Sequence, residues 1–218
     1  MSSSNPVEWK VSDRQIAYPD AIAEMEKRNA SVQAGKEPEL VWLLEHPPLY
    51  TAGTSSDPAE LLSSQFPVYE TGRGGRHTYH GPGQRVGYLV LNLKNHNSDI
   101  RAFVHALEDW VIAALAEFEV TARAVDGRVG IWCDTPEGQE AKIGAIGIRV
   151  RRWVTMHGFS VNISPDLDHF NGIIPCGISE YPVTSLQQLG IDAGLSDFDV
   201  ALKKTASEFF EAIEKQSA

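Results

Sequence analysis

The chain contains 218 residues, of which 42% are hydrophobic and 22% are charged, and its formal net charge is −10. This length suits one large domain with its own core, and we expect residues 1–218 to form a single domain. The negative charge argues against nucleic-acid binding, which needs a basic face. No apolar run approaches the roughly 20 residues of a membrane helix, and the N-terminus lacks the features of a signal peptide. We therefore expect a cytoplasmic protein that associates with neither nucleic acid nor membranes.

Three segments have the hydrophobic spacing of helices, namely residues 18–32, 98–118 and 196–214. Pro19 suits the first turn of the first helix. The apolar stripe of the second helix begins at Ile100, and we expect it to face the core. In the third helix, we expect Ser196 to be the N-cap and Val200 to reach the core.

Five other segments are rich in β-branched and apolar residues and are predicted to be strands. Several of them follow one another directly in the sequence, whereas helices separate the others. This mixture favours an α+β domain over a repeated βαβ fold. The predicted strands are residues 40–44, 85–93, 129–134, 141–151 and 153–163.

Residues 73–84 read Arg-Gly-Gly-Arg-His-Thr-Tyr-His-Gly-Pro-Gly-Gln. Four glycines and a proline in twelve residues exclude a regular helix. Glycine lets a ligand lie against bare peptide groups, so this loop is typical of a binding site, anchored on the strand that follows. The alternative is a turn-rich connection that carries polar side chains and binds no ligand.

Arginines gather in two places along this acidic chain. One interpretation is a local basic patch that steers an acidic partner towards the protein. The other is a set of solvated arginines on strand faces. The first group is Arg73, Arg76 and Arg85, and the second group is Arg149, Arg151 and Arg152.

The two cysteines, Cys133 and Cys176, are too few for a disulfide scaffold, and they lack the ligand spacing of a zinc site. Cys133 lies in an apolar strand pattern, so we expect it to be buried and inert. Cys176 lies in a turn between Pro175 and Gly177. A small neighbour there lets a substrate carbonyl approach and leaves backbone N–H groups free for an oxyanion. This pattern alone does not decide whether Cys176 is catalytic.

A catalytic thiol needs a base that converts it to the thiolate. The candidates are His77, His80, His157 and Lys142. Lys142 lies in an apolar run, and burial there would favour a neutral amine over the ammonium form. The spacing equally allows a strand lysine that points to solvent.

Four motifs follow one another in a fixed order: residues 73–84, 142–148 (Lys-Ile-Gly-Ala-Ile-Gly-Ile), 157–162 (His-Gly-Phe-Ser-Val-Asn) and 174–178 (Ile-Pro-Cys-Gly-Ile). Together they closely resemble those of the lipoyl(octanoyl) transferases, the octanoyl-[acyl-carrier-protein]:protein N-octanoyltransferases. Four motifs in register are far more specific than one. The resemblance implies a mixed β-sheet flanked by helices, similar to the catalytic domain of biotin and lipoate protein ligases.

The resemblance also implies roles for individual residues. Cys176 matches the nucleophile that carries the acyl group as a thioester, and Lys142 matches the lysine that activates it. Glycines in the second and third motifs would let an acyl chain lie close to the strands, although strand packing would explain them equally well. The acyl-binding site would comprise Arg73, Gly74, Gly75, Arg76, His77, Thr78, Tyr79, His80, Ala145, Ile146, Gly147, Gly158, Phe159 and Ser160.

The implied activity is transfer of an octanoyl group from octanoyl-acyl carrier protein to a specific lysine of apo lipoyl domains. These are the lipoyl domains of the 2-oxoacid dehydrogenase and glycine cleavage complexes. Exchange of a thioester for an amide is downhill, so we expect no ATP, metal or other cofactor. We also expect a monomer, whose arginine clusters help to dock the acidic carrier protein.

Two other functions fit parts of the sequence. An ATP-dependent lipoate or biotin protein ligase would also have a glycine-rich Arg-Gly-Gly loop, but it would form an acyl-adenylate and would not need Cys176. A non-catalytic acyl-binding or cofactor-binding protein would retain its ligand without forming a covalent species.

Overall fold

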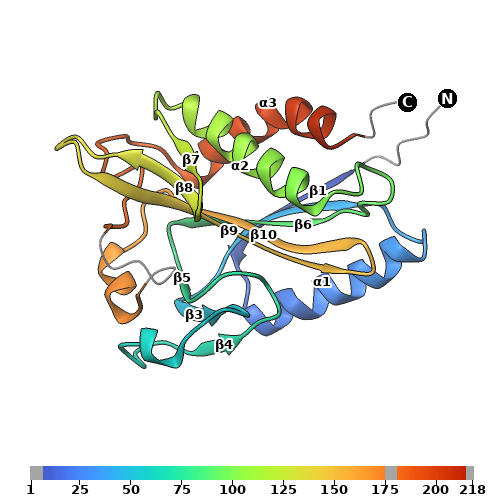
Figure 1. Cartoon of the computed structure of the whole chain (residues 1–218), viewed down its shortest axis with the longest axis horizontal. Coiled ribbons are helices and arrows are strands. Elements are labelled where there is room, and N and C mark those ends of the chain that lie inside the picture. Colours follow the sequence, from blue (N-terminus) through green and yellow to red (C-terminus); the bar gives the residue numbers. More distant parts are fainter. Residues whose placement is uncertain (1–6, 175–180, 215–218) are drawn as a thin grey trace.

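The computed structural model describes residues 7–174 and 181–214 of the chain. A seven-stranded sheet in the order β1-β2-β6-β10-β9-β8-β7 forms its centre, and a three-stranded sheet in the order β4-β3-β5 lies below it (Figure 1). Neighbouring strands of the large sheet are antiparallel, except for β1 and β2. The strands are β1 (Glu8–Gln15), β2 (Leu40–Glu45), β3 (Leu49–Ala52), β4 (Val68–Glu70), β5 (Thr78–His80), β6 (Gln84–Val90), β7 (Arg123–Val125), β8 (Arg128–Asp134), β9 (Glu140–Arg151) and β10 (Val154–Asn162).

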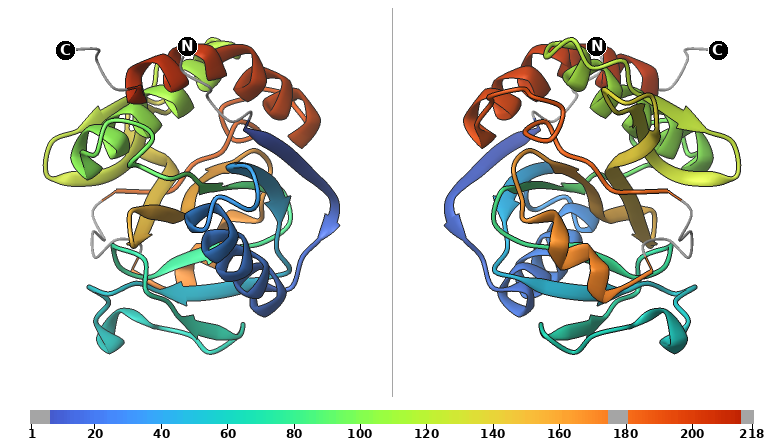
Figure 2. Two further views of the ribbon diagram at one scale, coloured as in Figure 1. Left: turned by 90° about the vertical axis from the view of Figure 1, so that its right-hand side faces the viewer. Right: turned by 90° about the vertical axis from the view of Figure 1, so that its left-hand side faces the viewer.

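Helices cover both faces of the large sheet. Helices α2 (Ile100–Ala116) and α3 (Leu195–Ile213) lie on one face, and α1 (Tyr18–Gln33) lies with the small sheet on the other (Figures 1 and 2). The rings of Trp110 and Phe209 stack with their centroids 4.7 Å apart and join α2 to α3. This mixed sheet between helices confirms the predicted α+β fold class. Among the described residues, no helix is both long and apolar enough to cross a membrane.

Strand β2 shows why the short apolar run was correctly predicted as a buried strand. Successive side chains of a strand point to opposite faces of the sheet. Leu40 and Trp42 belong to the core beneath α1, whereas Val41 and Leu43 belong to the core beneath α2 and α3. Because both faces are covered, no position within the strand has to be polar, and the strand is apolar from Leu40 to Leu44.

The three predicted helices are confirmed to within two residues at each end. Two predicted core residues were wrong: Ile100 is 43% exposed and Val200 is 66% exposed. Ile100 begins α2 almost one turn before Phe103, the first fully buried residue of the helix. Val200 lies off the stripe in which Phe198 and Leu202, one turn apart, face the core.

The predicted N-cap of the last helix was also wrong. Helix α3 begins at Leu195, so Ser196 lies inside its first turn and Gly194 is the N-cap. The backbone N–H of Gly194 donates to Oδ2 of Asp197 at 2.8 Å, so a carboxylate one turn into the helix caps it from within. The N-cap of α2 is a conventional one, because Oδ1 of Asp99 accepts hydrogen bonds from two backbone N–H groups of the first turn.

A two-residue turn joins β9 to β10. Its residues, Arg152 and Trp153, have φ angles of 53° and 69°, which favours the twist that a tight hairpin needs. Trp153 was predicted to begin the following strand, but it lies in the turn and is 40% exposed. Both residues carry side chains in a backbone conformation that usually selects glycine.

Arg85 is buried, and this corrects its assignment to a possible surface patch. Its Nε lies 2.8 Å from Oδ1 of Asp199, and its Nη2 donates to Oδ2 of the same carboxylate at 3.0 Å. The pair therefore links β6 to α3. Both side chains are almost fully buried, so each charge depends on the other for compensation.

The substitution Asp199→Ala should destabilise the protein by about 3–5 kcal/mol, because the guanidinium of Arg85 would remain buried without its carboxylate. Urea denaturation followed by circular dichroism would measure the loss. The double variant Arg85→Met/Asp199→Leu removes both charges and should recover most of the stability. If the double variant is as unstable as Asp199→Ala, the loss of stability comes from losing the ion pair and not from a buried charge without a partner.

Candidate functional site

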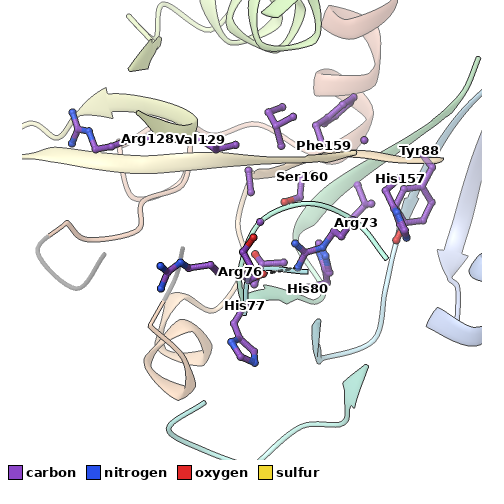
Figure 3. Close-up of a pocket in the computed structure, with 18 of the residues that line it drawn as sticks. Arg73, Arg76, His77, His80, Tyr88, Arg128, Val129, His157, Phe159 and Ser160 are labelled. Carbon is purple, nitrogen blue, oxygen red and sulfur yellow. Dashed lines mark hydrogen bonds between the residues drawn. The ribbon is translucent and has the colours of Figure 1, made fainter. Parts of the chain in front are cut away.

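A cavity of about 340 Å³ lies between the β9–β10 region of the large sheet and the loop that carries residues 73–80. Figure 3 shows this loop passing below the sheet, with side chains from both walls between them. The strand wall includes Val86, which belongs to the core on the α1 side of the sheet, and it also includes Ile146 and Phe159, whose side chains pack beneath α2 and α3 on the other side. Twelve of the predicted acyl-site residues line the cavity: Arg73, Gly75, Arg76, His77, Thr78, His80, Ala145, Ile146, Gly147, Gly158, Phe159 and Ser160.

Two of the predicted residues, Gly74 and Tyr79, lie outside this lining. The backbone N–H of Gly74 donates to the carbonyl of Ile148 at 3.0 Å and so ties the loop to β9. The ring of Tyr79 is fully buried in the core of the small sheet, and its hydroxyl lies 2.8 Å from Nδ1 of His169. Both residues support the wall of the cavity from behind.

Arg73 holds the loop in its shape. Its Nη2 donates to the carbonyl and the hydroxyl of Thr51 and to the carbonyl of Arg76, and its Nη1 donates to the carbonyl of Gly74. The side chain is buried, so Arg73 is an internal tie and not a surface cation that steers a partner. Of the loop arginines, only Arg76 has a substantially exposed side chain, at 45%.

Lys142 points inward, which decides between the two orientations that its spacing allowed. Its residue is only 7% exposed, and its Nζ donates to the carbonyl of Val129 at 2.9 Å. Nζ also lies 5.5 Å from the ring centroid of Trp132. A smaller hollow, which Lys142 lines, shares Thr78, Ala145 and Ser160 with the main cavity. The amine therefore lies at one end of a continuous recess.

Gly130 makes room for the side chain of Lys142, a role that was not predicted from the sequence. Its φ is 132°, and a Cβ at this position would lie 2.4 Å from Cε and 2.8 Å from Nζ of Lys142. The pairing of β8 with β9 shifts by one residue just after it, between Ile131 and Trp132. A glycine inside a strand pattern is the signal that could have identified this irregularity.

Cys176 lies outside the described residues, but the chain on both sides of its segment is tied to the site. Before it, the backbone N–H of Ile174 donates to the carbonyl of Glu60 at 2.8 Å. After it, the carbonyl of Pro182 accepts from the backbone N–H of Lys142 at 2.9 Å, and the N–H of Thr184 donates to the carbonyl of Lys142 at 2.9 Å. The segment that follows Cys176 therefore pairs with the same residue that supplies the amine.

The candidate histidine bases are placed less suitably than Lys142. Burial lowers the pKa of His80 to about 3, and its Nδ1 lies 2.6 Å from Oε1 of Gln84. Burial likewise lowers the pKa of His157 to about 3. The ring of His77 points away from the sheet, and its Nδ1 lies 3.6 Å from Oε2 of Glu60 (Figure 3). Neutral His80 orients a polar network, in which Gln84 donates to Oδ1 of Asn162 at 2.9 Å.

The opposite end of the cavity is closed by polar aromatic side chains that were not predicted to line it. These are Tyr18 from α1, Tyr88 from β6 and His157 from β10. Burial raises the pKa of Tyr18 to about 12, so its phenol is neutral at physiological pH. Tyr88 and His157 lie together at one end of the view in Figure 3, and Arg128 and Val129 lie at the other.

The strand glycines of the second and third motifs accommodate atoms of the protein itself. A Cβ at Gly158 would lie 2.1 Å from the carbonyl oxygen of Gly87. A Cβ at Gly147 would lie 3.0 Å from Cδ of Arg73, and one at Gly144 would lie 3.0 Å from the carbonyl oxygen of Ser160. Close packing of strands and loop therefore explains these glycines without a ligand.

Cys133 is buried as predicted, and burial raises the pKa of its thiol to about 11, which makes it a poor nucleophile. In the parts of the chain that the structure describes, no three His, Cys, Asp or Glu side chains are grouped as they would be around a metal ion.

Comparison with known proteins decides the family. The chain matches the family described as the lipoyl protein ligase A/B catalytic domain over residues 17–207. It is 60% identical over 206 residues to the octanoyltransferase of Sphingopyxis alaskensis, a match that covers 94% of this chain and 95% of that protein. The chain belongs to the octanoyltransferases of the lipoyl protein ligase A/B family. Octanoyltransferases are acyltransferases, and this chain is one of them.

Other octanoyltransferases are similarly close. That of Paramagnetospirillum magneticum is 58% identical, with 95% of this chain and 98% of the relative covered. That of Zymomonas mobilis is 57% identical, with 97% and 98% covered. The four motifs identified in the sequence therefore led to the correct family.

Solved structures show that the octanoyltransferase shares its fold with ligases. Lipoate-protein ligase A bound with ATP superimposes with a TM-score of 0.71 at 14% identity, covering 97% of this chain and 88% of the ligase. A bipartite lipoate protein ligase from Thermoplasma acidophilum gives 0.69 at 14% identity, with 97% and 87% covered. Biotin protein ligase from Aquifex aeolicus, in complex with biotin and ATP, gives 0.56 at 15% identity, with 97% and 72% covered. At these identities the likeness concerns the fold alone.

The substitution Gly130→Ala should lower the rate of acyl transfer by about 100-fold, because a Cβ there displaces the amine of Lys142. Steady-state kinetics would measure the effect. Gly138 is a matched control: its φ is 80°, but a Cβ there meets no atom within 4 Å. Gly138→Ala should cost similar backbone strain, about 1–2 kcal/mol, without loss of rate. Equal rates for the two variants would contradict the role of Gly130.

Proposed function

We propose that this octanoyltransferase moves an octanoyl group from octanoyl-acyl carrier protein to a lysine of an apo lipoyl domain, through a thioester on Cys176. The observation that carries the proposal is the buried amine of Lys142 at one end of an apolar recess of about 340 Å³. The relatives named above are octanoyltransferases. A narrow cavity beside a buried base suits a reaction that transfers an acyl chain from one carrier to another.

In the first half-reaction, Lys142 takes the thiol proton of Cys176. The thiolate attacks the thioester carbonyl of the carrier protein, and a new C–S bond forms. The bond to the pantetheine sulfur breaks, and the departing thiolate receives the proton held by Lys142. The orientation of Nζ supports this role, because the carbonyl of Val129 directs it towards the recess and away from solvent.

In the second half-reaction, the amine of the acceptor lysine attacks the acyl group on Cys176. A C–N bond forms, the C–S bond to Cys176 breaks, and the proton lost by the amine passes through Lys142 to the cysteine sulfur. One thioester has become one amide and one thiol, and atoms and charges balance without ATP, metal or another cofactor. The two segments that flank Cys176 are tied to Glu60 and Lys142, which supports a fixed approach of the thiol to its base.

The recess suits the hydrocarbon part of the substrate. It adjoins the hollow of Lys142 at Thr78, Ala145 and Ser160, and it continues along β10 past Gly158. Each methylene that moves from water into such a slot contributes about 0.8 kcal/mol. Affinity for the acyl chain should therefore come mainly from burial in the slot, while Lys142 and Cys176 act only at the thioester.

The positions of the arginines favour the cavity mouth for docking the carrier protein. Arg151 and Arg152 are exposed but lie at the end of β9 that is remote from Lys142, nine residues or about 30 Å along the strand. Arg76 and Arg128 instead lie beside the cavity, near its reactive end (Figure 3). Cations at the mouth are therefore the better candidates for contact with an acidic carrier protein.

Intact mass spectrometry tests the proposed chemistry. Incubation with octanoyl-acyl carrier protein without ATP should add one octanoyl group to the protein. The adduct should be lost in Cys176→Ala and retained in the matched control Cys133→Ala. Lys142→Arg should slow its formation by about 100-fold, because a guanidinium does not act as a base.

The same experiment separates the two other functions. Modification of a lipoyl domain at full rate by Cys176→Ala, with a requirement for ATP and free octanoate, would identify a ligase. Retention of octanoate without any covalent species or transfer would identify a binding protein.

The substitution Arg76→Gln should raise the KM for octanoyl-acyl carrier protein several-fold at low salt, and the difference should shrink as salt increases. Glutamine keeps an N–H group for Glu60, which now pairs with Arg76, but removes the positive charge. Kinetics at two salt concentrations would measure the effect. The double variant Arg151→Gln/Arg152→Gln is the control, and a larger effect there than in Arg76→Gln would place docking at the hairpin.

A further inference from the structure

His157 has an unusual backbone conformation for a residue within a strand. It pairs with Ile148 in the middle of the β9–β10 ladder, yet its φ is 62°. Residues other than glycine rarely adopt positive φ, and the conformation costs of order 1–3 kcal/mol. Such strain persists only where the surrounding structure holds it, and it is concentrated at ligand clamps and active sites.

The left-handed backbone conformation of His157 turns its side chain to the other face of the sheet. Phe159 and Val161, which have the same parity along β10, pack into the core beneath α2 and α3. Regular alternation would place residue 157 on that side as well. Instead its Nε2 lies 3.4 Å from the hydroxyl of Tyr18, and its ring centroid lies 5.8 Å from that of Tyr88, on the face covered by α1. The left-handed conformation thus moves the imidazole into the end of the cavity.

This end is the one remote from Lys142. The hollow of Lys142 joins the cavity at Ser160, which pairs with Ala145, whereas His157 lies three residues further along β10. Three residues of a strand span about 10 Å. That distance is comparable to the length of an extended eight-carbon chain. Figure 3 shows His157 beside Tyr88, at the opposite end of the view from Arg128 and Val129.

The neighbours of His157 are held more firmly than His157 itself. The hydroxyl of Tyr88 lies 2.7 Å from Nε2 of His46, whose Nδ1 donates to the carbonyl of Ile16 at 2.6 Å. Tyr18 packs against the ring of Tyr69 with the centroids 5.1 Å apart. Among the described residues, the ring of His157 makes one long hydrogen bond, with Tyr18, and an edge contact with the ring of Tyr88, while its buried Nδ1 has no hydrogen-bond partner. Its loss would therefore break few interactions.

We propose that the imidazole of His157 is the stop that sets the maximum length of the acyl chain, with Tyr18 and Tyr88 forming the floor around it. This inference rests on the proposed acyl transfer. A chain longer than the slot would have to displace a ring that neighbouring tyrosines surround, while a shorter chain would leave part of the slot empty. His157 thus acts as a specificity-determining residue that takes no part in proton transfer.

The test is the chain-length profile of His157→Gly, measured with hexanoyl-, octanoyl-, decanoyl- and dodecanoyl-acyl carrier protein. Glycine removes the stop and adopts the same φ without strain, which offsets part of the cost of removing a buried ring, so the variant should still fold. The ratio of kcat/KM for decanoyl to that for octanoyl should rise by about 15-fold, because each of the two newly buried methylenes contributes about fourfold. His157→Asn, which is shorter and tolerates positive φ, should give an intermediate shift.

Trp153→Gly is the matched control, since Trp153 also has a positive φ, of 69°, but lies in the β9–β10 turn outside the cavity lining. It should relieve similar strain without changing the profile. An unchanged profile in His157→Gly, or an equal shift in Trp153→Gly, would overturn the inference.

Calorimetric binding of free octanoate, decanoate and dodecanoate separates this inference from the proposed function. If the parent protein fails to transfer octanoyl from the carrier, the proposed function is wrong. A shift towards longer fatty acids in His157→Gly would then still support His157 as the end of the slot. If the parent transfers octanoyl but neither kinetics nor binding shifts in His157→Gly, the function stands and the role of His157 is wrong.

Discussion

The buried guanidinium of Arg73 is the contact on which the site depends. A glycine-rich loop has little intrinsic preference for one shape, because glycine loses more conformational freedom on folding than any other residue. Arg73 offsets this cost with hydrogen bonds to three residues, two of them within the loop and one, Thr51, on β3. The loop thereby keeps one shape, and the backbone hydrogen bond from Gly74 to Ile148 ties it to β9 beside the cavity.

The same contact explains why glycines occur on both sides of it. A Cβ at Gly53 would lie 2.2 Å from the carbonyl oxygen of Gly75, and one at Gly147 would touch the side chain of Arg73. At these two positions the loop approaches the small sheet and β9 so closely that a glycine hydrogen fits where a Cβ would not. These glycines therefore allow the protein to pack closely around the cavity, and they are not needed to make space for a ligand.

The fold and most of the cavity lining could be predicted from the sequence, because both depend on local patterns and on motifs in a fixed order. The orientation of Lys142 could not, since it depends on the shifted pairing at Gly130 on a different strand. The burial of Arg85 was also hidden, because its partner Asp199 lies 114 residues away. His157 was recognised as a motif residue, but alternation gave no sign that its ring turns to the opposite face.

The fold is shared with ligases that bind ATP, whereas the transfer that we propose uses only a thiol, a base and a slot. The base and the segment after Cys176 are joined through backbone hydrogen bonds, and the slot extends away from them along β10. The proposal thus separates the chemistry from recognition of the acyl chain along one strand pair. Substitutions at the two ends should therefore affect different kinetic constants.

The buried histidines have a consequence for the behaviour of the protein in acid. His46, His80 and His157 are neutral in the folded chain, where burial lowers their pKa values to about 4, 3 and 3 from an ordinary value of 6.5. Below pH 6.5 the unfolded chain takes up protons at these positions that the folded chain excludes, so the free energy of unfolding falls until the folded values are reached. The cluster that shapes the end of the cavity therefore also makes the protein sensitive to acidification.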